Sequence, residues 1–245
     1  METRISQASP DRVEVRGRDL AGDLMGRLSF SEYFHLLLTG REPTDDERFF
    51  LDLLLVSIAE HGLMPSNVAA RMTLAADPGS LHGAVAAGIL GAGPVILGAT
   101  EECALLLQRA HARGGSPAAA AAEVAGEIHG AGRRIPGFGH PLHRPLDPRA
   151  ERILALADER GVSGPHVALA RALRDAVADI WGMPLTLNVS LPIAAVLLDL
   201  GYPPTVAKAV PILARTAGLL AHLTEEREHP IGLQLAARAV EPRDE

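Results

Sequence analysis

The sequence has 245 residues, a formal net charge of −7 and a single cysteine. Because the chain is acidic and has no basic segment interleaved with aromatic residues, nucleic acid and anionic membrane surfaces are poor candidate partners. The lone thiol, Cys103, excludes an internal disulfide, and the polar N-terminal segment lacks a signal-peptide hydrophobic region, so we expect a cytoplasmic protein with no membrane partner.

The composition favours helices. Hydrophobic residues make up 47% of the chain but aromatic residues only 3%, so the core must be aliphatic. The abundant alanine and leucine favour helices over strands. Residues 12–16 alternate between charged and apolar side chains and precede Gly17, which is the one convincing strand signal. The predicted fold class is all-α (mainly helical) with a short N-terminal β element.

Capping residues place the helix boundaries. Ser29 is suited to cap a helix that ends at Gly40, and Thr44 with Glu47 forms a capping-box pattern for a helix that ends before His61. Later helices are expected at residues 67–76, 81–90, 101–112, 165–181, 191–200 and 205–224, with two more that begin at Ser116-Pro117 and Asp147-Pro148.

The most unusual segment is an irregular loop before Asp147. Residues 133–149 contain four prolines, two glycines, two histidines and four arginines. Binding residues concentrate on rigidly held loops, although a solvated basic loop is the alternative. Asp147 is placed to cap the next helix and so to direct Arg149. No metal site is predicted at His140 and His143, because the segment is not helical and no cysteine or nearby carboxylate completes a ligand set.

This loop resembles the signature of the citrate synthase family. The matching residues are Gly137-Phe138-Gly139-His140 followed by Asp147-Pro148-Arg149. The local form Gly-His-Pro-Leu-His-Arg-Pro is most similar to the short, citryl-CoA lyase-like branch. Weaker matches occur in the family's order from about residue 12 to residue 232 and include the turn Glu60-His61-Gly62.

The resemblance implies a role for each matching residue. His140 would donate a hydrogen bond to the keto or hydroxyl oxygen of a dicarboxylate, and His61 would help to hold the same ligand. Arg149 and Arg215 would clamp its carboxylates, since a guanidinium matches a carboxylate in two parallel hydrogen bonds. The residues implied along bound coenzyme A are Ile135, Gly137 and Gly139. The alternatives are that His61 only ends a helix and that Arg215 is an ordinary surface residue; we interpret His222 as structural.

The resemblance also implies an architecture and ligands. A large helical lobe would comprise residues 1–101 and 184–245, with residues 102–183 inserted as a small lobe, and two such chains would form a homodimer. The ligands would be an acyl-CoA such as acetyl-CoA and a small dicarboxylate such as oxaloacetate. Coenzyme A thioester would be a co-substrate, and no tightly bound cofactor is expected.

Two positions depart from the family's pattern. Ser190 occupies the position of the family's base, an aspartate, and Ile96 occupies that of the histidine that stabilises the enol. A neutral serine is too weak a base and isoleucine donates no hydrogen bond. One hypothesis is an acyltransferase or lyase whose base comes from substrate, water or a residue such as Glu101. The other is a pseudoenzyme that binds coenzyme A or a dicarboxylate without turnover.

Overall fold

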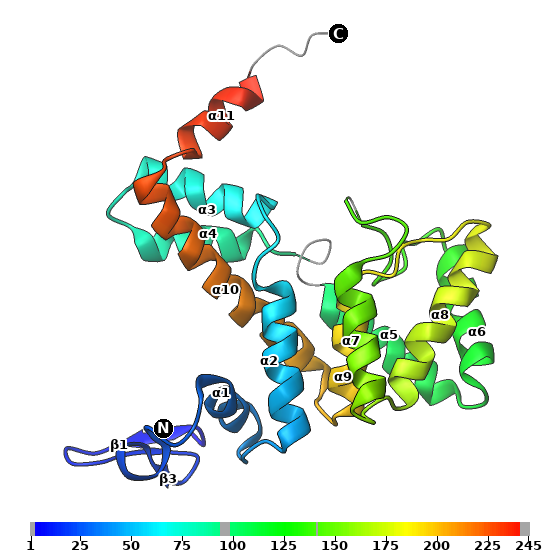
Figure 1. Cartoon of the computed structure of the whole chain (residues 1–245), viewed down its shortest axis with the longest axis horizontal. Coiled ribbons are helices and arrows are strands. Elements are labelled where there is room, and N and C mark those ends of the chain that lie inside the picture. The colour runs from blue at the N-terminus through cyan, green and yellow to red at the C-terminus, as the bar shows by residue number, and fades with distance from the viewer. Residues whose placement is uncertain (1–2, 94–98, 141, 241–245) are drawn as a thin grey trace. The chain divides into compact units, whose positions relative to one another are not determined.

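The structure is a computed structural model that describes residues 3–93, 99–140 and 142–240. The chain divides into two compact units, Met1–Leu53 and Leu54–Glu245, and the boundary falls within helix α2 (Asp45–Ala59) (Figure 1). Each unit is described by itself. The predicted lobes, residues 1–101 with 184–245 and residues 102–183, remain a prediction.

The first unit contains the β element. Strands β1 (Ser6–Ala8), β2 (Val13–Val15) and β3 (Arg18–Asp19) form an antiparallel sheet in that order, followed by a π-helical turn η1 (Leu20–Leu24) and helix α1 (Phe30–Thr39). Val15, Leu24 and Leu36 form its small apolar core. The predicted strand is β2. Strand β1 was not predicted, because its three residues are exposed and carry no apolar alternation.

The predicted caps of the first two helices are confirmed. Ser29 Oγ accepts a hydrogen bond from the backbone N–H of Glu32, whose carboxylate accepts one from the Ser29 N–H, and Gly40 ends α1 in the left-handed conformation. Thr44 and Glu47 exchange the same pair of bonds, at 2.8 and 3.2 Å, before α2.

The second unit is helical, which confirms the predicted class. Its elements after α2 are α3 (Pro65–Ala76), α4 (Leu81–Leu90), α5 (Ala99–Arg113), α6 (Pro117–Gly130), α7 (Pro148–Glu159), α8 (Pro165–Trp181), α9 (Ser190–Asp199), α10 (Pro204–Glu228) and α11 (Gly232–Val240). Helix α11 lies beyond the last predicted helix, which covers residues 205–224.

Helices α9 and α10 form the centre of this unit. Helix α9 is buried from Ser190 to Leu198 and packs on α5, α7, α8 and α10. Helix α10 also contacts α3, α4 and α5. By length and composition α10 could cross a membrane, but half of its most apolar window is buried within the fold. Packing on four helices accounts for its apolar character.

Candidate active site

His61 lies on a tight turn between α2 and α3. One carboxylate oxygen of Glu60 accepts hydrogen bonds from the backbone N–H groups of His61 and Gly62, at 2.8 and 2.6 Å. Gly62 has a φ of +77°, which favours glycine, and Asn67 Nδ2 donates to its carbonyl oxygen at 2.6 Å. The His61 backbone is therefore fixed by side chains on both sides of the turn.

The loop that carries His140 is attached to the segment before α9. Gly139 N–H donates to the carbonyl of Thr186 at 2.7 Å, and Asn188 N–H donates to the carbonyl of Gly137 at 2.9 Å. Gly137 has a φ of +83°, and a Cβ there would lie 2.7 Å from Leu191 Cβ. The loop can approach α9 this closely only because position 137 has no side chain.

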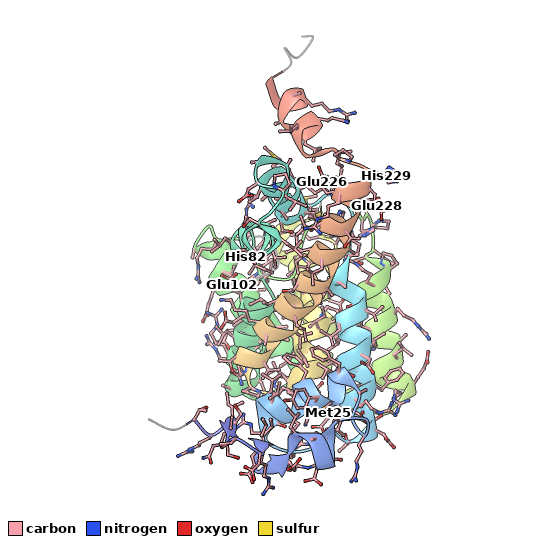
Figure 2. The ribbon with its side chains drawn as sticks, turned by 90° about the vertical axis from the view of Figure 1, so that its left-hand side faces the viewer. Met25, His82, Glu102, Glu226, Glu228 and His229 are labelled. Atoms are coloured by element: carbon pink, nitrogen blue, oxygen red, sulfur yellow. The ribbon has the colours of Figure 1, made fainter. Side chains whose placement is uncertain are left out.

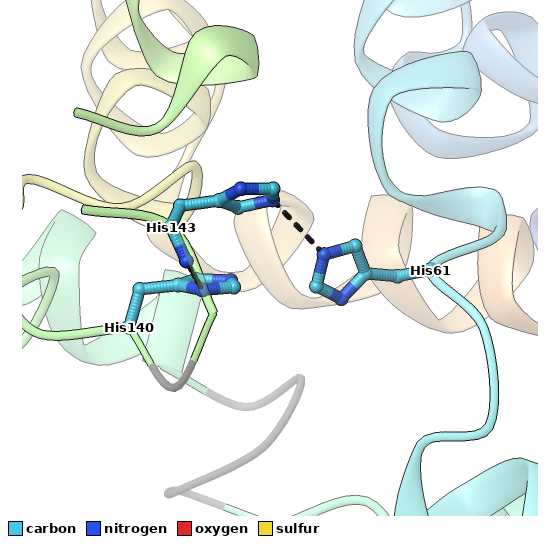
Figure 3. A group of neighbouring side chains, drawn as sticks. All are labelled: His61, His140 and His143. Carbon is cyan, nitrogen blue, oxygen red and sulfur yellow. Dashed lines mark hydrogen bonds between the residues drawn. The ribbon is translucent and has the colours of Figure 1, made fainter. Parts of the chain in front are cut away.

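Three imidazoles come together where this loop meets the His61 turn (Figure 3). The rings of His140 and His143 lie against each other with centroids 4.4 Å apart and a tilt of 31°, and His61 Nε2 lies 3.2 Å from His143 Nε2. The centroids of His61 and His140 are 5.2 Å apart. The backbone N–H groups of Leu142 and His143 both donate to His140 Nδ1, at 3.1 and 2.9 Å. Neutral His140 therefore carries its proton on Nε2, where it can only donate.

Arg149 is directed toward His140 by Asp147. The buried Asp147 carboxylate caps α7 through the Arg149 N–H and accepts two bonds from the Arg149 guanidinium, at 3.0 and 2.9 Å. It also accepts a bond from Val189 N–H at 3.1 Å. Arg149 Nη2 thus lies 3.3 Å from His140 Nε2. An oxygen acceptor of a ligand could receive hydrogen bonds from both of these donors.

Arg215 reaches the same region from the interior of α10. Its side chain is 2% exposed, and its guanidinium donates weakly to Asn67 Oδ1 and to the carbonyl of Ile58, at 3.4 and 3.3 Å. Within the described part of the chain, Nε has no hydrogen-bond partner and no carboxylate forms an ion pair with this residue. Burial lowers the pKa of this guanidinium more than the charge of Glu60 raises it, so an anion bound beside Arg215 would be stabilised.

The electrostatics of the cluster favour an anionic ligand. Burial, followed by the positive charge of Arg149, lowers the pKa of His61, and the charge of Arg215 acts in the same direction. Burial and the neighbouring His143 lower the pKa of His140. Both imidazoles are therefore neutral near pH 7, beside two permanent guanidinium cations. The four residues predicted to bind the dicarboxylate gather in one cluster although they lie far apart in the sequence: His61, His140, Arg149 and Arg215.

A network of buried charged and polar side chains from α3 and α10 supports the His61 turn. Arg71 donates to His222 Nδ1 at 3.0 and 2.7 Å and to Glu226 at 2.8 Å. His222 Nε2 lies 3.0 Å from Glu60, the carboxylate that holds the turn. Glu226, near the C-terminal end of α10, also accepts a bond from Gly232 N–H at 2.6 Å (Figure 2). His222 is therefore a hydrogen-bonded member of the scaffold, as the sequence suggested.

His61 brings a third imidazole to His140 and His143, a group of three that the sequence did not predict. Ligand atoms of His61, His140 and His143 all lie within 4.8 Å of one another, a spacing that could hold a metal ion. However, His140 Nδ1 already accepts two N–H groups, and Arg149 and Arg215 add positive charge beside the cluster. This donor set suits an anion better than a cation.

The residues implied for coenzyme A lie along the same loop. Ile135 and Gly137 are buried, and Gly139 is exposed. The Ile135 side chain is therefore closed to a ligand, whereas the backbone of Gly139 is open to one.

A groove of about 400 Å³ opens beside Pro136. Apolar side chains line it together with Arg109, Arg133 and Arg134, and with the carboxylate of Glu102. Three guanidinium groups around an apolar floor match a ligand that carries phosphates and an aromatic base.

The positions that depart from the family's pattern are only partly described. Ser190 is the first residue of α9, 9% exposed, and its N–H donates to Asn188 Oδ1 at 3.1 Å. Ile96 lies outside the described residues. Glu101 forms an ion pair with Lys208 at 2.9 Å. Burial raises the pKa of the Cys103 thiol, which is consistent with an inert structural residue.

Comparisons with known proteins place the chain in a family. Residues 16–234 match the model described as "Citrate synthase, C-terminal domain". A citrate synthase from Heyndrickxia coagulans is 30% identical over 82% of this chain and 53% of that protein. The chain spans about half the length of the curated relatives it matches.

Solved structures agree with the family model. Citryl-CoA lyase from Hydrogenobacter thermophilus is 31% identical with a TM-score of 0.87, and the match covers 100% of this chain and 95% of that chain. Citrate synthase from Thermotoga maritima, 24% identical with a TM-score of 0.70, covers 89% of this chain and 57% of that chain and shares the fold. The predicted resemblance and fold are thereby confirmed, and the chain belongs to the citrate synthase family.

Proposed function

We propose that this protein cleaves, and in reverse forms, the carbon–carbon bond of a citryl-CoA-type thioester, with acetyl-CoA and oxaloacetate as the other pair of reactants. The single observation that carries the proposal is the cluster of imidazoles beside Arg149 and Arg215, in which His140 and Arg149 direct donors to one region and the buried Arg215 has an Nε with no hydrogen-bond partner among the described residues. The match along nearly its whole length to a citryl-CoA lyase supports the cleavage direction.

Each partner in the cluster has a task in this chemistry. The Nε2–H of His140 would donate to the oxygen that is hydroxyl in citryl-CoA and keto in oxaloacetate, beside Arg149 Nη2. Arg149 and Arg215 would bind the carboxylates. Because these groups are held before the ligand arrives, little reorganisation is needed when charge develops on the oxygen.

The thioester would lie along the loop of Ile135, Gly137 and Gly139. The groove beside Pro136 would receive the phosphate-bearing part of coenzyme A, with its arginines as phosphate partners. Coenzyme A would arrive and leave as a co-substrate. We further propose a cytoplasmic homodimer, on the basis of the family resemblance and the single cysteine.

A second candidate is a binding protein without turnover. It is favoured by one observation, the serine at position 190 where the family's pattern has its base. In that case the cluster would bind the dicarboxylate, but no group in the family's usual position would move the proton.

The two candidates are separated by turnover. Purified protein is incubated with citryl-CoA, and oxaloacetate is followed through NADH oxidation by malate dehydrogenase. We expect oxaloacetate and acetyl-CoA in equal amounts. Arg149→Gln should lower kcat/KM about tenfold to a hundredfold, the worth of one lost charged hydrogen bond.

The matched control is Arg152→Gln, on the same helix, whose side chain is 61% exposed in an ion pair with Glu159. It should leave kcat/KM unchanged. Citrate binding without any citryl-CoA cleavage would support the binding protein instead, and the absence of both would overturn the assignment of the site.

A further inference from the structure

His143 occupies a position in the cluster for which the proposed function has so far no use. Its ring lies against that of His140, and its Nε2 lies 3.2 Å from His61 Nε2 (Figure 3). A contact of this kind between two imidazoles requires one nitrogen to carry a proton and the other to offer a lone pair. The His61–His143 pair therefore holds a basic nitrogen within the cluster, whereas neutral His140 presents only a donor.

The surroundings decide which of the two rings accepts a further proton. His61 faces Arg149 and Arg215, and burial together with these cations lowers its pKa. The carboxylate of Asp147 acts in the opposite direction on the pKa of His61, and the charge of His143 is among the influences that lower the pKa of Asp147. Of the two rings, His143 lies nearer to the donor His140, with centroids 4.4 Å apart against 5.2 Å for His61, so the geometry selects His143 as the proton acceptor.

His143 is also held in place. Its backbone N–H donates to His140 Nδ1 at 2.9 Å, and its carbonyl accepts a bond from Thr186 Oγ1 at 3.2 Å. The residue that fixes the tautomer of His140 therefore presents its own ring beside it. A proton donor and a proton acceptor are placed side by side by one loop.

We propose that His143 is the proton-transfer base of this site and replaces the aspartate whose position is taken by Ser190. This inference rests on the proposed function. In the cleavage direction, the hydroxyl proton of the 3-hydroxyacyl-CoA moves to His143 Nε2. The bond between the carbinol carbon and the thioester α-carbon breaks, its electron pair passes to the thioester as an enolate, and the keto acid is released. The imidazolium then gives its proton to the α-carbon, which yields acetyl-CoA and regenerates the base.

The test uses the whole chain, citryl-CoA turnover and citrate binding by calorimetry. His143→Gln keeps an amide that can hydrogen-bond to His61 but cannot take up a proton. We expect it to lower kcat by at least about a hundredfold, the usual contribution of a general base, with little change in citrate affinity. His143→Ala should regain part of its kcat when free imidazole is added. The control is His82→Gln, an exposed imidazole on α4, which should leave kcat unchanged.

The outcomes are distinguishable. Wild-type turnover that survives in His143→Gln overturns the inference and leaves the proposed function intact, as does a His143→Ala variant that imidazole does not rescue. Citrate binding by the wild-type chain without any citryl-CoA cleavage overturns the base assignment and leaves only the binding half of the proposed function. A wild-type chain that neither binds nor cleaves overturns both.

Discussion

Replacing Asp147 should both destabilise the fold and impair the site. Its carboxylate is 0% exposed, caps α7, pairs with the Arg149 guanidinium and accepts a bond from Val189 N–H. Asp147→Ala would remove all of these at once. Breaking a buried pair from one side typically costs about 3–5 kcal/mol. The lost cap, about 1 kcal/mol alone, is contained in that range rather than added to it, because the contributions share one carboxylate.

The assay is urea unfolding followed by circular dichroism, with Asp158→Ala as the matched control. Asp158 also pairs with an arginine, Arg171, but its side chain is 50% exposed, so we expect a loss below about 1 kcal/mol. Equal losses of stability in the two variants would refute this prediction, because burial of the Asp147 pair would then have no measurable consequence.

Asp147 should also affect how the stability of the fold depends on pH. Burial alone would raise the pKa of Asp147, but the hydrogen bonds and charge of Arg149 outweigh it and hold that pKa below its usual range. The unfolded chain therefore binds the proton first as pH falls. The stabilisation is complete above the unfolded pKa, about 3.9, and is lost as pH falls through the lower, folded pKa. Asp147→Ala should remove this part of the pH dependence of unfolding.

Three further predictions concern other residues. Arg215→Lys should weaken citrate binding about tenfold or more in calorimetry, because an ammonium cannot form the paired bonds of a guanidinium; equal affinity would contradict the clamp. Gly137→Ala should lower the free energy of unfolding by about 1–3 kcal/mol in urea, because its Cβ would meet Leu191 Cβ at 2.7 Å and its φ is +83°; wild-type stability would contradict the close approach. The hydrogen bond from Arg41 and the other groups around Glu47 lower the pKa of Glu47 to about 2. Glu47→Gln should therefore flatten the loss of folding stability between about pH 4.3 and pH 2. An unchanged pH dependence of unfolding in this variant would contradict the Arg41–Glu47 pair.

Local patterns in the sequence were enough to place most helices. The capping box of Ser29, the Thr44–Glu47 exchange and the Asp147 cap involve residues within three positions of one another, and all three are present. The elements that were missed have weak local signals. Strand β1 has no apolar alternation, and α11 is a nine-residue helix after His229 and Pro230.

Which residues form the site was harder to predict, because the residues that contact one another there are far apart in the sequence. The pair His61 and His143 is separated by 82 residues, and Arg215 and Asn67 by 148 residues. No helical or strand period relates such positions. The family resemblance supplied His61, His140, Arg149 and Arg215 but assigned no role to His143. That the ring of His143 meets His61 follows from how the loop is attached to the segment before α9, which only the three-dimensional structure reveals.

The proposed function requires above all that a single anion bind in this cluster. Long-range ¹H–¹⁵N spectra of the imidazole nitrogens report each of the 10 histidines separately as citrate is added. We predict that the signals of His61, His140 and His143 shift together along one saturable curve, while exposed His82 and His229 stay in place. Saturation by citrate with the first three signals unmoved would contradict the account.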